Sequence, residues 1–293
     1  MIDWLREDLP TALLGAAVTL AWLAVIFVPL EWARPRWSSQ SRLRRGLATD
    51  LAFFAGQHLV FGALVAWILT RIYGLAPLAA LADLQGAFAR LPMALQVITA
   101  LILGDLAMYW AHRAQHSFAW LWRFHAVHHS SEALDFVAAH REHPVDGLYT
   151  QFFMNLPAVL LGFSYEAVLG LVAFRGLWAT AIHANVRLPL GPLAHLIGSP
   201  QFHHLHHLRR RDVGNYANLA PWIDHLFGTH RHGEDDADPS RTLDLGLDSP
   251  APRTYLGLLA LPFRRWSDLE GEQVGAPAEP SAPDPGPGIP AGS

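Results

Sequence analysis

The sequence has no cysteine and no lysine, and acidic and basic residues together make up only 16% of its 293 residues. Without cysteine the chain forms no disulfides, thiolate zinc sites, cysteine nucleophiles or cysteine-ligated iron–sulfur clusters. The charged fraction lies below the roughly 25% of an average soluble domain, while 52% of the residues are hydrophobic. The net charge is −4 and the basic residues are scattered, so nothing predicts nucleic-acid binding. This balance indicates a membrane protein.

Long apolar runs predict several membrane helices. The run from Thr11 to Leu30 contains no charged residue and has the roughly 20 residues that a helix needs to cross a bilayer. A cleaved signal peptide is disfavoured because mainly acidic residues precede this run. Residues 51–69 and 95–110 are long enough to span when tilted, and residues 148–182 predict a helical hairpin that turns near Gly162. We therefore expect an all-α integral membrane protein with about four to five membrane helices.

The distribution of arginine predicts the orientation of these helices. The loop after the first run contains five arginines: Arg34, Arg36, Arg42, Arg44 and Arg45. Loops rich in basic residues face the cytoplasm, so this loop is expected to be cytoplasmic. Counting crossings from there places all of the histidine clusters on the cytoplasmic face of the membrane, which we expect to be a bacterial inner membrane.

Composition also divides the chain into two parts. Residues 1–271 form the expected membrane-embedded domain, with its histidine-rich region at residues 105–229. Residues 272–293 are rich in proline, glycine and alanine, and such a segment cannot bury enough apolar surface to become ordered. The second part is therefore expected to be a disordered tail.

Histidine is over-represented, with 17 copies, and many of these lie in three short clusters. The first cluster has the spacing H-x-x-x-H, and residues four apart lie on the same face of a helix. The other two share the spacing H-x-x-H-H, which places three imidazoles along one side of a helix. The clusters are His112 and His116; His125, His128 and His129; and His203, His206 and His207.

Eight imidazoles exceed what one four-coordinate zinc ion takes, whereas they suit two metal ions with several ligands each. The sequence therefore predicts a dinuclear centre. Imidazole binds iron, zinc, copper and nickel alike, so the ligands alone do not select the element. His183, at the end of the predicted hairpin, is a candidate ninth ligand. Surface histidines placed by chance could explain one such cluster. They do not readily explain three clusters that all have ligand spacing and lie on the same predicted face of the membrane.

Other polar residues are candidates for supporting roles. Asp105 lies seven residues before His112 inside a predicted membrane helix, where ionisable residues are rare and functional by default. We expect it to accept a hydrogen bond from a ligating imidazole; an interfacial ion pair with arginine is the alternative. For His140 and His143, ligation, support of a ligand and a simple loop position all remain open. The spacing predicts no ligand role for the remaining histidines, which are His58, His195, His204, His225, His230 and His232.

The clusters and their flanking residues resemble the fatty acid hydroxylase and sterol desaturase superfamily over residues 105–229. The resemblance includes Tyr109-Trp110-Ala-His112-Arg113, Leu121-Trp122-Arg123-Phe124-His125 and His143-Pro144-Val-Asp146-Gly147. It continues through Ile182-His183-Ala-Asn185, Pro200-Gln-Phe-His203, Asn215-Tyr216 and Trp222-Ile-Asp224. Ala217 departs from the family pattern, which commonly has glycine after Asn-Tyr. Residues 140–147 are most similar to the sterol C5-desaturase branch.

This resemblance implies a cytoplasmic di-iron centre that uses O2 to hydroxylate or desaturate a lipid, such as a sterol, fatty acyl chain, alkylglycerol or carotenoid. It also implies that Asn185, Asn215 and Asp224 support the centre or add ligands. Since no cytochrome b5 module is visible, electrons are expected from a separate ferredoxin, cytochrome b5-like protein or reductase.

Two other functional classes remain open at this stage. A membrane zinc hydrolase would need a general base beside the metal, yet no glutamate lies inside a histidine cluster. A metal transporter or storage protein would need ligands near the bilayer midplane, whereas the clusters lie beyond the ends of the predicted spans.

Overall fold

A computed structural model describes residues 9–64, 67, 70–71, 79–232 and 243–264. Within these ranges the chain is helical, and its only extended pairings are two isolated bridges, Pro35 with Val186 and Leu208 with Leu245. The predicted all-α class is therefore confirmed. The predicted disordered tail, residues 272–293, lies outside the described residues.

Four helices of the described part are long and apolar enough to cross a membrane. They are α1 (Leu9–Ala33), the segment Leu47–Leu64 that contains α2 (Leu47–Gly56) and the π-helix η2 (Gln57–Phe61), α5 (Met93–Ser117), and α8 (Tyr165–His183). Each corresponds to an apolar run of the sequence. The number agrees with the predicted four to five membrane helices.

The predicted hairpin is formed by α8 and the preceding helix α7 (Pro144–Leu160). Gly162 adopts a φ of 82° in the turn, a left-handed conformation that glycine reaches without a steric penalty. Ser164 then caps α8, because its side chain accepts a hydrogen bond from the backbone N–H of Ala167 at 3.3 Å. The break therefore lies where the sequence predicts it.

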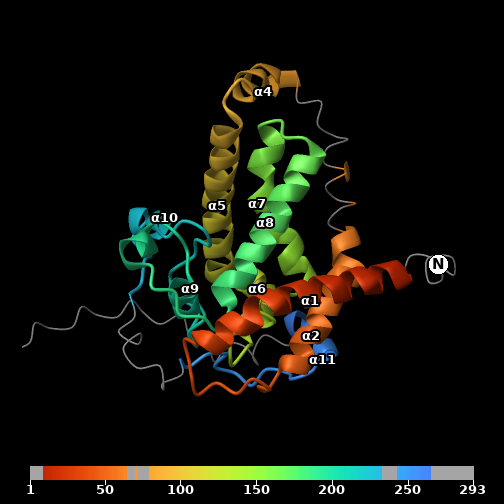
Figure 1. Cartoon of the computed structure of the whole chain (residues 1–293), viewed down its shortest axis with the longest axis vertical. Coiled ribbons are helices and arrows are strands. Elements are labelled where there is room, and N and C mark those ends of the chain that lie inside the picture. Colours follow the sequence, from red (N-terminus) through yellow and green to blue (C-terminus); the bar gives the residue numbers. More distant parts are fainter. Residues whose placement is uncertain (1–8, 65–66, 68–69, 72–78, 233–242, 265–293) are drawn as a thin grey trace, which may run out of the picture.

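In Figure 1, α5, α7 and α8 form an upright bundle, with α4 (Ala82–Ala89) at its far end and α1 lying across its lower end. The bundle packs through a core that includes Ala100, Val159 and Val168. On α1, Leu23 and Phe27 pack in a second core that continues into residues just after α8. The four candidate spans are therefore not all parallel.

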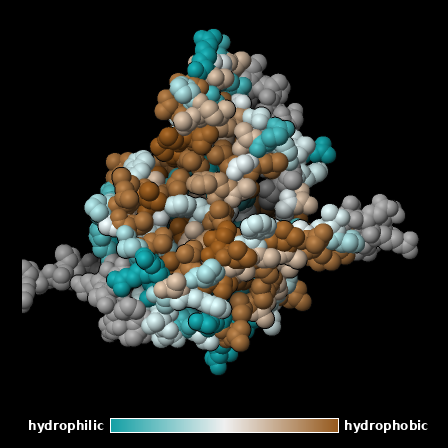
Figure 2. Space-filling model, in the orientation of Figure 1, coloured by the Kyte–Doolittle hydropathy of each residue, from teal (hydrophilic) through white to brown (hydrophobic). Residues whose placement is uncertain are grey.

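The outer surface of the helices is apolar. Figure 2 shows hydrophobic residues over much of the bundle and α1, whereas hydrophilic residues gather at the base and at the α4 end. On α1, for example, Leu14, Trp22 and Val25 are about two-thirds exposed. A contiguous apolar surface of this kind is unstable in water but is the normal surface of a helix in lipid.

Shorter helices build a cap at the lower end of the bundle. They are α6 (Ala119–His129), η4 (Ala138–His140), η5 (Gly191–His195), α9 (Pro200–His206), α10 (Trp222–Leu226), α11 (Tyr255–Leu259) and η7 (Leu261–Phe263); η3 (Ala79–Leu81) precedes α4 instead. Helix α9 begins at Pro200 and is capped by Ser199, which accepts a hydrogen bond from the N–H of Phe202.

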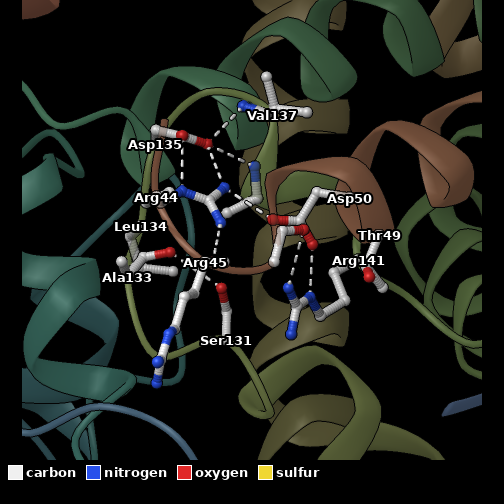
Figure 3. Close-up of polar contacts among 12 residues, drawn as sticks. Arg44, Arg45, Thr49, Asp50, Ser131, Ala133, Leu134, Asp135, Val137 and Arg141 are labelled. Atoms are coloured by element: carbon white, nitrogen blue, oxygen red, sulfur yellow. Dashed lines mark hydrogen bonds and ion pairs between the residues drawn. The ribbon is translucent and has the colours of Figure 1, made fainter. Parts of the chain in front are cut away.

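A buried ion network joins the segment after α1 to this cap (Figure 3). Arg44 binds both carboxylate oxygens of Asp135, at 2.6 and 2.7 Å, and also pairs with Asp50 at 2.6 Å. Asp50, which is fully buried, pairs in turn with Arg141. Each buried charge is thus compensated, whereas removal of one member leaves an uncompensated charge in a low-dielectric interior.

We predict that Asp50→Asn lowers the free energy of unfolding by about 3–5 kcal/mol, because it leaves the buried guanidinium of Arg141 without its counter-ion, while Arg44 keeps only Asp135. Chemical unfolding in detergent measures this change. Asp244→Asn is the matched control, because Asp244 pairs with Arg209 at 2.7 Å but its side chain is 77% exposed; its cost should stay below about 1 kcal/mol. Equal losses in the two variants would contradict the assignment.

Candidate metal centre

All nine predicted histidine ligands converge where the cap meets the bundle. Helix α5 supplies two of them, α6 three, the last residue of α8 one, and α9 with its C-cap three. They form two groups, in each of which the ligand atoms lie within 4.8 Å of one another. The first group is His112, His116, His125, His129 and His206; the second is His128, His183, His203 and His207.

Each H-x-x-H-H cluster is divided between the two groups. In α6, His125 and His129 are four residues apart and join the first group, while His128 joins the second. In α9, His203 and His207 join the second group and His206 joins the first. The spacing places the three imidazoles of a cluster along one side of a helix, and the structure divides them there between the two groups. The i, i+4 pair faces one group and the residue between them faces the other.

The ring nitrogens lie at the spacing of ligands around a single ion. In the first group, Nε2 of His112 lies 3.0 Å from Nε2 of His125. In the second group, Nε2 of His183 lies 3.1 Å from those of His128 and His203. Two nitrogens that each lie about 2.0–2.1 Å from one ion are about 2.9–3.4 Å apart when the N–metal–N angle lies between a right angle and the tetrahedral angle.

In six of the rings, the hydrogen bond made by Nδ1 establishes which nitrogen carries the proton. Nδ1 of His112 donates to the carbonyl of Tyr216 at 2.7 Å, and Nδ1 of His206 donates to that of Gly214 at 2.8 Å. Four others donate in the same way, to a carbonyl or, for one, a carboxylate: His116, His125, His128 and His183. Since these oxygens only accept hydrogen bonds, Nδ1 is protonated and Nε2 presents a lone pair.

The residues present therefore fit metal ions. Without a cation, buried nitrogen lone pairs would face one another at 3.0–3.1 Å, which is unfavourable. Nε2 of His116 is buried and has no hydrogen-bond partner. Burial also lowers the pKa of His125, His129, His203 and His207 well below the ordinary value for histidine, which keeps these rings in the neutral form that binds metals.

Asp146, at the start of α7, orients one of these rings. Its Oδ2 accepts the Nδ1–H of His125 at 3.0 Å, while its Oδ1 accepts from Gln115. A carboxylate behind an imidazole fixes the ring and increases its basicity. Sequence reasoning did not assign this role to Asp146. The sequence did offer a signal for this role. Many ligating imidazoles need hydrogen-bond acceptors, and Asp146 is a carboxylate in the His143-Pro-Val-Asp segment.

Asp105 and Asp224 support the centre through the backbone. Asp105 accepts hydrogen bonds from the N–H groups of Asn218, Leu219 and Ala220 at 2.8–3.2 Å, so the predicted bond from an imidazole is wrong. Asp224 accepts from the N–H groups of Tyr216 and Ala217 at 2.8 Å. The two carboxylates thus hold the loop whose Tyr216 carbonyl binds His112.

Asn185 and Asn215 are also structural. Asn185 exchanges hydrogen bonds with the backbone of Trp37, which joins the end of α8 to the segment after α1. Asn215 has a φ of 54°, and its side chain bonds the backbone of Phe202 and Arg231. Neither residue belongs to the two histidine groups.

His140 and His143 lie outside both groups as well. Nδ1 of His140 donates to Gln57 at 2.8 Å. Nδ1 of His143 accepts from the N–H of Val145 and thereby caps α7, while its Nε2 faces the carbonyl of Leu259. These hydrogen bonds involve no histidine of the two groups, so of the three roles left open by the sequence they favour a position in the loop.

A cavity of about 520 Å³ opens directly onto both groups. Its floor includes His112 and His125 of the first group with His128, His183 and His203 of the second. Its walls come from α1, α5, α7 and α8, and include Leu23, Met108, Met154, Gly176 and Leu177. The volume is within the usual range for small-molecule sites.

The structure combines four membrane-length helices with a cavity that ends on two buried groups of histidines. These features define a class of membrane protein that can bind two metal ions. Within that class, residues 97–229 match the model of the fatty acid hydroxylase family. This match and the relatives below confirm the resemblance seen in the sequence.

Among curated proteins, the chain is 34% identical over 177 residues to the ornithine lipid hydroxylase OlsE of Rhizobium tropici, covering 59% of this chain and 52% of that protein. It is 34% identical over 127 residues to alkylglycerol monooxygenase of Danio rerio, covering 43% of this chain and 28% of that protein.

It is also 28% identical over 147 residues to the Delta(7)-sterol 5(6)-desaturase ERG3B of Gibberella zeae, covering 50% of this chain and 45% of that protein. The chain thus spans about half or less of the length of these relatives, all of which are named as lipid oxidoreductases. No solved structure matches the chain significantly.

Replacing the carboxylate behind His125 should weaken the centre. We predict that Asp146→Ala lowers metal affinity by about 10–100-fold, because His125 loses the partner that orients its ring. Metal retained against chelators of graded strength measures the change. The control is Asp83→Ala on α4, an exposed carboxylate remote from the centre. Unchanged retention in Asp146→Ala would contradict the role.

Proposed function

We propose that this protein is an O2-dependent, non-haem di-iron oxidoreductase of the membrane that hydroxylates or desaturates a C–H bond of a lipid. The observation that carries the proposal is the pair of all-histidine groups at the floor of a cavity between membrane-length helices. The relatives, named as lipid hydroxylase, monooxygenase and desaturase, support oxidation of a lipid.

The nine imidazoles would hold the two ions: five from one group and four from the other. Iron bound there supplies redox-active sites at which O2 is activated to oxidise an unactivated C–H bond. The protein's part is to hold the rings, exclude water and position the lipid. A separate donor, such as a ferredoxin, a cytochrome b5-like protein or a reductase, supplies the electrons.

The walls of the cavity favour a lipid substrate. Leu23, Met108 and Leu177 provide apolar contacts beside the histidine floor. Glu142 also lines the cavity, and burial raises its pKa to about 8, so in the absence of metal it is a neutral hydrogen-bonding group at pH 7. A cavity that combines apolar walls with polar side chains such as Gln151 and Arg175 suits an acyl chain or ring system that carries a polar end.

A zinc hydrolase is the main rival within enzymes. Each ligand group consists of histidine alone, and the carboxylate that contacts the first group, Asp146, is already engaged by His125 and Gln115, which leaves it poorly placed to act as a general base. For metal transport, ligands along a path through the bundle are expected, whereas here both groups lie at the cap. We further propose an inner-membrane location with the histidine groups facing the cytoplasm.

The function is tested by comparing the lipids of cells that express the wild type, His203→Ala or His204→Gln under ¹⁸O2. Wild type should yield a lipid that has gained one ¹⁸O atom or lost two hydrogens. His203→Ala removes a metal-facing ring and should yield neither change. His204→Gln is the matched control, because His204 is adjacent to His203 but belongs to neither ligand group and hydrogen-bonds the backbone carbonyl of His183 instead. Oxygen drawn from water would support a hydrolase, and metal flux without lipid change a transporter.

The cavity can be blocked without touching the histidines. Gly176 lines it, and a Cβ built at Gly176 meets no heavy atom within 4 Å. We predict that Gly176→Phe reduces turnover on the order of a hundredfold by displacing the substrate, with metal content unchanged. Gly176→Ala fills almost none of the cavity and should retain turnover. Equal turnover in both variants would contradict the proposed substrate path.

A further inference from the structure

Three histidines outside the buried centre also converge, on the surface of the cap around α10. His195 ends η5, His225 lies in α10, and His230 follows α10. Their ligand atoms all lie within 4.8 Å of one another. Their sequence spacing gives no sign of this, because His195 comes from a segment 30 residues before His225. The structure therefore corrects the prediction that these histidines have no ligand arrangement.

The rings are close enough to share an ion after small rotations. Nδ1 of His195 lies 3.2 Å from Nε2 of His225. The rings of His225 and His230 are stacked, with centroids 3.7 Å apart and planes 12° apart. The ring of His232 lies 4.2 Å from that of His230 and is a potential fourth ligand. His195 and His225 are exposed, so their side chains can turn their nitrogens toward a common point.

The backbone beneath the cluster is fixed, which limits the cost of assembling a site. The N–H groups of Thr229 and His230 both donate to the carbonyl of Asp224, at 2.8 and 3.2 Å. The N–H of Arg231 donates to the side chain of Asn215 at 2.7 Å. Only side-chain rotamers therefore need to be ordered when a ligand binds.

One nitrogen of the cluster lacks a hydrogen-bond partner. Nδ1 of His230 is buried and unpaired. Burial, with the neighbouring His225 and His232, lowers the pKa of His230 to about 4, so this ring is neutral at pH 7. A buried unpaired acceptor beside two further imidazoles is an arrangement that a cation with nitrogen preference satisfies.

We propose that His195, His225 and His230 form a third metal site, which binds one divalent transition-metal ion of the zinc, nickel or cobalt class. Three imidazoles leave a coordination position for water or His232. The cluster contains no carboxylate, which disfavours calcium and magnesium. The site is independent of the reaction proposed above.

The proposed site is joined to the buried centre by one loop. Asn215 bonds the backbone of Arg231, while the residues on either side of it, Gly214 and Tyr216, bind His206 and His112 through their carbonyls. A metal ion at the surface would therefore tie η5 to residues 225–230, next to Arg231, which bonds the loop that orients two buried ligands. Binding to the folded state alone also raises stability.

The test uses full-length protein purified without a polyhistidine tag, with its buried metal already bound. Titration with Zn²⁺ in a calorimeter should show one further equivalent for the wild type. His195→Ala, His225→Ala and His230→Ala should each weaken this binding at least on the order of tenfold, since a direct ligand contributes at least as much as an outer partner. The resident metal content should stay unchanged.

Leu226→Ala is the control, because Leu226 is exposed on the same short helix and should leave zinc binding intact. Resident metal content measured on every variant separates loss of the surface site from unfolding of the cap. The proposal is overturned if the wild type takes up no further zinc, or if all three histidine variants bind zinc as tightly as the wild type.

Discussion

The structure depends on a set of buried imidazoles whose nitrogen lone pairs are made to face one another. Hydrogen bonds from Nδ1 of six rings fix the tautomer, so that Nε2 points inward, and burial keeps the rings neutral. Such an arrangement is costly alone and becomes favourable only when cations occupy the two groups. The remainder of the cap can be understood as the means of holding nine rings in this position.

That support is mostly indirect. Asp105 and Asp224 bind backbone N–H groups of the 216–220 loop, which in turn offers a carbonyl to His112. The ion network of Asp50 and Arg141 acts similarly, because the carbonyl of Arg141 accepts the Nδ1–H of His128 at 3.0 Å. Carboxylates near the centre therefore contribute rigidity more than ligation, and the ligand groups remain entirely histidine. The cavity above them is lined by both apolar and polar side chains of the surrounding helices.

Much of this was predictable from sequence because the signals are local. Apolar length predicts the spans, and i, i+4 spacing predicts which histidines share a face. The division of each H-x-x-H-H cluster between two groups depends on how α5, α6, α8 and α9 pack, which spacing does not encode. The bonds of Asp105 to a loop more than a hundred residues away, and the cluster of His195 with His225, likewise arise only from tertiary structure. The direction of α1, which lies across the bundle (Figure 1), also depends on tertiary packing and not on its own sequence.

The central claim is that the histidines bind two adjacent metal ions through nitrogen alone. Anomalous scattering at the iron edge from crystals of the iron-loaded protein tests it most directly. The account predicts two peaks: one within bonding distance of Nε2 of His112, His125 and His206, and one within bonding distance of Nε2 of His183, His203 and His207. A single peak, or iron bound elsewhere while both histidine groups remain empty, would contradict it.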